Sequence, residues 1–253
     1  TVAGLRRAEP RAMAAVAAAG AAAGSKPLIR GVVFDMDGTL TVPCIDFAEM
    51  KRRAGVPANA DILDTIESWE DVARREAAYA AIAEVEAEAL QRMRVMPGCE
   101  QLCAELDARR VPRALITRNV RAGVRHFHDH HLTPTGLNMF SPAITRECEF
   151  EYKPSPAALL HICESWGIDP SEAVMVGDSY KDDVVCGNRA GTITVLLDFE
   201  RRNGYTVDQF SGEERPTHVV SSLTDVAVLL REHYELQPAA APHGLVLPTG
   251  DKT

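Results

Sequence analysis

Acidic side chains are grouped in two separate segments of the sequence, and carboxylates in such groups can bind a metal ion and react with phosphate. The segment Asp35-Met36-Asp37-Gly38-Thr39 follows one short apolar run, and Asp178, Asp182 and Asp183 follow another. Carboxylates that lie close together repel one another, so they either share protons or hold a cation. Because these ligands are hard oxygen atoms, with no histidine or cysteine converging on them, the expected ion is Mg²⁺.

Hydrogen-bond donors at two further points extend this chemistry. Thr117-Arg118-Asn119 ends an apolar run, and Lys153 opens the segment Lys153-Pro-Ser-Pro before a helical pattern. An aspartate beside Mg²⁺ can attack phosphorus and form an aspartyl-phosphate. A lysine and hydroxyl or backbone donors then stabilise the equatorial oxygens of the phosphoryl group. Together the four segments predict phosphoryl transfer.

Short apolar runs alternate with helical patterns, and this alternation must position the four segments. The runs cover residues 28–34, 113–117, 173–177, 192–197 and 218–220, and the helical patterns cover residues 99–110, 120–131, 155–166, 182–190 and 223–233. Short aliphatic runs are typical of strands that are covered on both faces. The pattern predicts an α/β fold with a Rossmann-like, doubly wound parallel sheet. Such sheets bind ligands at the carboxyl ends of their strands, where all four segments lie.

One segment interrupts the alternation. Residues 47–96 contain no convincing strand, and the patterns over 62–69 and 72–94 are helical. The segment therefore predicts a small all-helical cap, inserted after the first strand of a core formed by residues 28–46 and 97–235. Near its start, Lys51-Arg52-Arg53 could either meet a second anionic group of a substrate or form a solvated helix face.

The two ends of the chain differ in composition from the rest. Residues 1–27 are rich in alanine and basic but poor in acidic residues, which suggests either a chloroplast or mitochondrial transit peptide or a disordered leader of a cytoplasmic protein. Residues 236–253 contain three prolines and little periodicity, which is typical of a flexible tail.

Composition excludes several other classes of protein. The chain carries 27 basic and 36 acidic residues, for a formal charge of −9, and this argues against a nucleic-acid-binding protein. No apolar run approaches the roughly 20 residues of a membrane span. The six cysteines show no paired spacing typical of a zinc site or a disulfide framework. The expected partner is a small phosphorylated metabolite, and the sequence does not determine an oligomeric state.

The four segments, in this order, resemble the four motifs of the haloacid dehalogenase superfamily. The resemblance extends over residues 28–222 and rests on Asp35-x-Asp37-Gly-Thr, on Thr117, on Lys153-Pro and on Gly-Asp178-Ser-x-x-Asp-Asp183. It implies that the insertion is a helical cap of the C1 type, placed between the first and second motifs. It also implies a Mg²⁺-dependent enzyme in which a mobile cap excludes water and contacts the leaving group.

The resemblance also implies a role for each matching residue. Asp35 resembles the nucleophile and a metal ligand, while Asp37 resembles the general acid and base, with its carbonyl oxygen on the metal. The amide of Met36 and the hydroxyl of Thr117 would contact the phosphoryl group, as would the loop of Arg118 and Asn119. Lys153 would neutralise negative charge, Asp178 would complete the metal site, and either Asp182 or Asp183 would be its second acidic residue.

The acid at position 37 bears on the type of reaction. Dehalogenases of the superfamily lack it, because no alkoxide leaves, so its presence favours hydrolysis of a phosphomonoester such as phosphoglycolate, a sugar phosphate or a nucleotide. A sugar phosphomutase and a non-catalytic binding protein of the same fold are the two alternatives.

Overall fold

The computed structural model describes residues 25–239, and their central feature is a parallel sheet of six strands. The strand order is β4 (Ala143–Ile144), β3 (Arg113–Ile116), β2 (Gly31–Phe34), β5 (Ala173–Gly177), β6 (Ile193–Leu197) and β7 (His218–Val220). A separate parallel pair joins β1 (Leu28–Ile29) to β8 (Glu235–Leu236). After β2 the chain adds strands on one side of the sheet and then returns to add β5 on the other side. The expected doubly wound α/β fold is confirmed.

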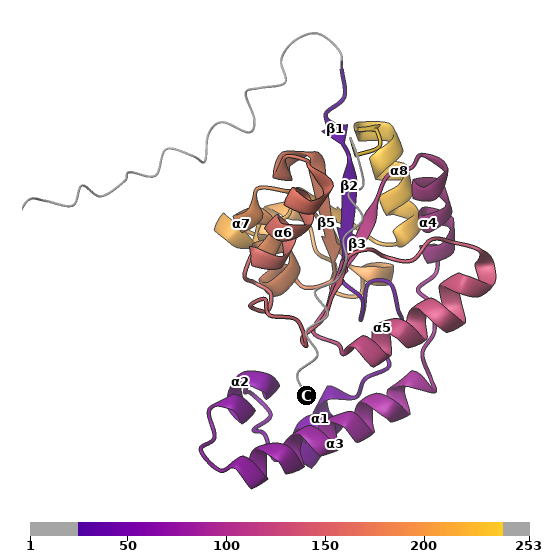
Figure 1. Ribbon diagram of the computed structural model, residues 1–253. Helices are drawn as coiled ribbons and strands as arrows, with labels where there is room; N and C mark the ends of the chain where they lie inside the picture. The colour runs from indigo at the N-terminus through magenta and orange to yellow at the C-terminus, as the bar shows by residue number, and fades with distance from the viewer. Residues whose placement is uncertain (1–24, 240–253) are drawn as a thin grey trace, which may run out of the picture.

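Helices cover both faces of this sheet (Figure 1). One face packs against α4 (Cys99–Ala108), α5 (Arg121–Phe127) and α8 (Leu223–His233), and the other against α6 (Ala157–Trp166) and α7 (Val185–Ala190). Successive side chains of a strand point to opposite faces, so Val32 and Phe34 join the first core and Val33 joins the second. Burial on both faces explains why these strands are apolar without alternation.

Three helices form the cap, and they lie apart from the sheet in Figure 1. These are α1 (Phe47–Ala54), α2 (Ile62–Glu67) and α3 (Val72–Leu90). Each begins after an aspartate, Asp46, Asp61 or Asp71, whose carboxylate accepts a hydrogen bond from a backbone N–H of the first turn. The three helices share an apolar cluster of their own around Ile66 and Ile82. A helical insertion between the first and second strands of the sheet is therefore confirmed.

The structure also contains elements that the sequence pattern did not indicate. Strand β4 has only two residues, which is too short for a periodic signal. Strand β8 contains Leu236, where the tail was expected to begin, and the amide of Gln237 donates to the carbonyl of Ile29. Nearly all of the basic leader and most of the tail lie outside the described residues. No helix among residues 25–239 is long and apolar enough to cross a membrane.

Helix α6 lies very close to strand β2, and Gly31 makes this approach possible. A Cβ atom at position 31 would lie 2.3 Å from the ring of Trp166. We expect Gly31→Ala to lower the free energy of unfolding by about 1–3 kcal/mol, since the core would be overpacked. Urea denaturation measures this loss. In a protein that already carries Trp166→Leu, Gly31→Ala should lower the free energy of unfolding by a smaller amount. An equal loss with and without Trp166→Leu would contradict the predicted clash.

Candidate active site

The carboxyl ends of β2, β3 and β5 meet at one edge of the sheet, and the predicted residues lie there. Phe34 of β2 is level with Leu115 of β3 and with Val176 of β5, so the residues that follow these strands come together. Strand order reverses at β2, and such a reversal opens a crevice between the connecting loops of a parallel sheet. The register of three strands thus places Asp35, Thr117 and Asp178 at a shared crevice.

The loop after β2 depends on a glycine. Gly38 has a φ angle of +92°, a conformation that glycine adopts without steric cost. A Cβ atom at this position would lie 2.2 Å from Oδ2 of Asp178. Gly38 therefore allows the loop that carries Asp35 and Asp37 to lie directly against the loop after β5.

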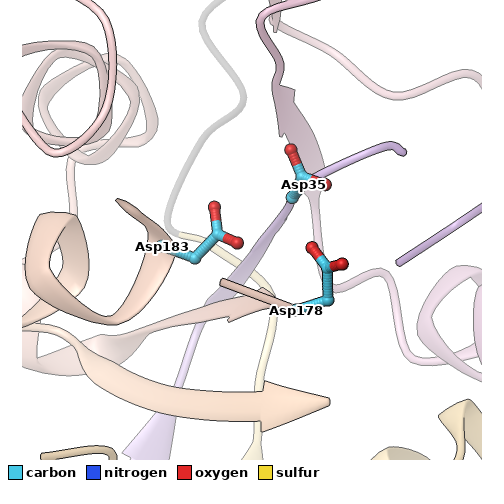
Figure 2. Close-up of side chains that lie close together, drawn as sticks. All are labelled: Asp35, Asp178 and Asp183. Carbon is cyan, nitrogen blue, oxygen red and sulfur yellow. The ribbon is translucent and has the colours of Figure 1, made fainter. Parts of the chain in front are cut away.

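Three carboxylates come together at this edge, as Figure 2 shows. Oxygen atoms of Asp35, Asp178 and Asp183 all lie within 4.8 Å of one another. Asp183 lies on a π-helical turn, Tyr180–Val184, and accepts a hydrogen bond of 3.0 Å from the amide of Ser179. The carboxylate of Asp182 instead accepts a hydrogen bond from the hydroxyl of Ser179. Of the two candidates for the second acidic position, Asp183 is the one that the structure brings into the cluster.

Lys153 supplies the positive charge of this cluster. Its ammonium group lies 2.5 Å from Oδ1 of Asp35 and 2.7 Å from Oδ1 of Asp183, and it also donates to the carbonyl of Ile116. The side chain is almost completely buried. Burial by itself would lower the pKa of Lys153, but the charges of Asp183 and Asp35 outweigh it and hold this pKa above its ordinary value. The lysine is therefore charged and fixes two carboxylates at once.

One lysine leaves this cluster with an excess of negative charge. Asp178 forms no ion pair with any described residue, and desolvation together with the charges of Asp35 and Asp183 raises its pKa to about 8. Desolvation also raises the pKa of Asp183 to about 6 and that of Asp35 above its ordinary value. A divalent cation among these oxygens would relieve both the repulsion and the desolvation. The donor set consists only of oxygen atoms, and it fits Mg²⁺.

The loop after β3 contacts the second aspartate of the first motif. The side-chain amide of Asn119 donates to Oδ2 of Asp37 at 3.0 Å. The backbone N–H of the same residue donates to the hydroxyl oxygen of Thr117. Burial raises the pKa of Asp37 although the bond from Asn119 opposes this shift. A carboxyl group whose pKa is raised is suited to donate and then accept a proton. Thr117 itself is buried and lines the cavity beside Asp35.

Met36 and Arg118 were also predicted to contact the phosphoryl group, and their side chains make other contacts in the structure. The side chain of Met36 is completely buried in the core, and its backbone amide is the group that contacts Asp35. The guanidinium of Arg118 lines the cavity but pairs with Asp61 of the cap at 3.0 Å. It also lies over the ring of Tyr152. Arg118 therefore joins the cap to the core at the rim of the site.

A cavity of about 390 Å³ lies between these residues and the cap. Its cap side is mainly apolar and is formed by Ile45, Phe47, Met50, Ile62, Leu63 and Ile82. Helices α1, α2 and α3 all contribute to this wall, so a molecule bound at Asp35 would extend toward the cap.

A second ion pair between cap and core was not anticipated from the sequence. Glu86 of α3 accepts two hydrogen bonds from Arg146, of 2.5 and 2.9 Å, and both side chains are largely buried. The backbone amide of Arg146 donates to the carbonyl of Asn119, which ties this pair to the loop that holds Asp37. A signal was available, because Glu86 lies four residues after Ile82 on the buried stripe of α3.

Comparison with known proteins identifies the family of this chain. The family profile of the haloacid dehalogenase-like hydrolases matches residues 29–191. A haloacid dehalogenase-like hydrolase domain-containing protein of Arabidopsis thaliana is 44% identical over 225 residues, which cover 85% of this chain and 89% of that protein. Phosphoglycolate phosphatase 1 of Pseudomonas aeruginosa is 29% identical over 222 residues, or 79% of each chain.

Solved structures show the same fold. The crystal structure of a hydrolase from Pseudomonas syringae superposes with a TM-score of 0.64 and 18% identity, and the match covers 81% of this chain and all of that one. The match of the family profile extends over more than half of the chain, from β1 to the end of α7. The chain therefore belongs to the haloacid dehalogenase-like hydrolases.

Proposed function

We propose that this hydrolase is a Mg²⁺-dependent phosphatase that cleaves a small phosphomonoester through an aspartyl-phosphate. The observation that carries the proposal is the arrangement around Asp35. Its carboxylate is held by Lys153, lies beside Asp178 and Asp183, and opens into a cavity that Asp37 also lines. The phosphoglycolate phosphatase of P. aeruginosa supports a phosphatase activity by its similarity but leaves the substrate of this chain open.

In the first half of the reaction, a carboxylate oxygen of Asp35 attacks phosphorus and the bond from phosphorus to the leaving oxygen breaks. Lys153 lies on Oδ1 of Asp35, so it orients the carboxylate and balances negative charge on the phosphoryl oxygens. The hydroxyl of Thr117 is a further donor at the same edge of the cavity. Asp37 enters this step protonated, and its proton passes to the leaving alkoxide.

In the second half, water attacks phosphorus of the aspartyl-phosphate. Asp37, now ionised, accepts the proton of this water, and the bond between phosphorus and the oxygen of Asp35 breaks. Inorganic phosphate leaves, Asp35 is restored as a carboxylate, and Asp37 is again protonated. The hydrogen bond from Asn119 keeps Asp37 in position through both steps.

Asp35, Asp178 and Asp183 would hold the Mg²⁺ ion, together with the backbone carbonyl of Asp37. When bound, the ion supplies positive charge for the phosphoryl oxygens and offsets the repulsion among the three carboxylates. The ion pairs that join cap and core, Glu86 with Arg146 and Asp61 with Arg118, hold the cap over the cavity and limit the access of bulk water.

Asp35→Asn tests the nucleophile. We expect Mg²⁺-dependent release of phosphate from a panel of phosphomonoesters to fall more than about a thousandfold, because the amide cannot form the phosphoenzyme. Asp64→Asn, on the exposed surface of the cap, is the matched control and should keep full activity. Undiminished release by Asp35→Asn would contradict the assignment, and an isomerised sugar phosphate in place of free phosphate would indicate a mutase.

Asp37→Asn tests the general acid through the leaving group. We expect kcat/KM for benzyl phosphate, which loses an alkoxide, to fall by about 10²–10⁴-fold. The decrease for p-nitrophenyl phosphate should be much smaller, since its leaving phenolate needs no proton. The two esters are similar in size, so steady-state kinetics with both separates protonation from binding. Equal losses for the two esters would rule out the assigned role.

Asp178→Asn tests the metal site by thermal denaturation. In EDTA the variant should melt at or above the temperature of the unsubstituted protein, because repulsion with Asp35 and Asp183 is relieved. Mg²⁺ at a hundred times its Kd should stabilise the unsubstituted protein by about 2.7 kcal/mol, and this gain should vanish in the variant. Asp182→Asn is the control and should keep the gain. If Mg²⁺ instead stabilised Asp178→Asn and failed to stabilise Asp182→Asn, the metal would be assigned to Asp182.

A further inference from the structure

Helix α1 carries three consecutive basic residues, and two of them are neutralised within the cap. Arg52 pairs with Glu49 at 2.6 Å, one turn away on the same helix. Arg53 pairs with Glu49 at 2.7 Å and with Glu88 of α3 at 2.8 Å. These two arginines therefore belong to the outer surface of the cap and to its internal contacts.

Lys51 lies on a different face of the same helix. Side chains three and four residues apart share one face of an α-helix, and Phe47, Met50, Lys51 and Ala54 follow this spacing. Met50 and Ala54 are buried, whereas Phe47, Met50 and Lys51 line the cavity. Lys51 thus occupies a position on the apolar stripe of the helix and is partly buried there.

No carboxylate neutralises Lys51 among the residues that the structure describes. Its ammonium group donates one hydrogen bond, of 2.8 Å, to the backbone carbonyl of Ala58. That bond leaves two of its three N–H donors available. A cation that is partly withdrawn from water, beside Met50, gains most from an anionic partner.

The other basic side chains that line the cavity already have carboxylate partners. Arg118 pairs with Asp61, and Arg146 pairs with Glu86. Lys153 lies between Asp35 and Asp183. Among the described residues that line the cavity, Lys51 is thus the cation whose charge is not balanced, and it belongs to the cap, whereas Asp35 belongs to the core.

We infer that Lys51 is a specificity-determining residue, which binds a second anionic group on the leaving alcohol of the substrate. This inference rests on the proposed phosphatase function. The phosphoryl group would lie at Asp35, the carbon chain would lie against the apolar wall around Phe47 and Met50, and a terminal carboxylate or phosphate would reach the ammonium group of Lys51. The substrate class is a phosphomonoester that carries a second acidic group.

The test compares substrates that differ only in this charge. A series of phosphooxy carboxylic acids, with one to four carbon atoms between the ester oxygen and the carboxyl group, is paired with the corresponding carboxamides. For the member of best length, we expect kcat/KM to be at least about tenfold higher for the carboxylate, the factor that one charge-assisted hydrogen bond supplies.

Three variants show whether Lys51 causes this preference. In Lys51→Met the ratio of the two kcat/KM values should fall close to one, mainly through a higher KM for the carboxylate, because the contact exists both before and during reaction. Lys51→Arg should retain much of the ratio. Arg52→Met, on the outer face of the same helix, should leave it unchanged. Thermal denaturation in parallel shows that each variant is folded.

Two results would overturn the inference. Either no member of the series is hydrolysed with a higher kcat/KM as the carboxylate than as the carboxamide, or the variant Lys51→Met shows the same preference as the unsubstituted protein. Calorimetric binding of the corresponding non-hydrolysable phosphonates, with and without the carboxylate, measures the same contrast without turnover. If no ester releases phosphate, the proposed function fails. The phosphonates then still decide whether Lys51 binds the second anion, since loss of the binding preference in Lys51→Met supports the inference and its persistence refutes it.

Discussion

The ammonium group of Lys153 is shared between two buried carboxylates, and most of the site depends on this shared contact. One positive charge cannot balance Asp35, Asp178 and Asp183 together, so the cluster keeps an excess of negative charge. Desolvation, together with this repulsion, raises the pKa values of Asp178 and Asp183, and the excess of negative charge underlies the affinity for a divalent cation that we propose. A structure built only for stability would not place a third, unpaired carboxylate beside two that share one lysine.

The parallel sheet determines where the three aspartates of this cluster lie. Parallel strands in fixed register bring residues from distant parts of the chain to one edge, and glycines allow their loops to approach closely. Gly38 leaves room for Asp178, and a Cβ atom at Gly177 would lie 2.1 Å from the carboxyl group of Asp183. Close approach of the backbone thus brings the three carboxylates together, and the ammonium group of Lys153 holds two of them in place.

The cap forms the part of the cavity that we propose selects the substrate. The core side of the cavity is polar, whereas the cap side combines an apolar wall with Lys51. The pairs Glu86 with Arg146 and Asp61 with Arg118 connect the two parts at the rim. In this structure the guanidinium groups of Arg146 and Arg118 are therefore paired with carboxylates of the cap, although both side chains line the cavity.

Local pattern was sufficient to predict every strand of the six-stranded sheet except β4, the helical insertion and the residues at the strand ends, because periodicity and short motifs are local properties of the sequence. The two-residue strands β4 and β8 are too short for such a pattern. The sequence left Asp182 and Asp183 as alternatives, since the motif of the superfamily allows either spacing after Asp178. Only the π-helical turn directs Asp183 toward Lys153. Likewise, the sequence alone does not distinguish the three basic residues Lys51, Arg52 and Arg53. The packing of α1 places Lys51 at the cavity and pairs the two arginines with Glu49. The contact of Glu86 with Arg146 joins residues 60 positions apart, and such pairs are decided by tertiary packing.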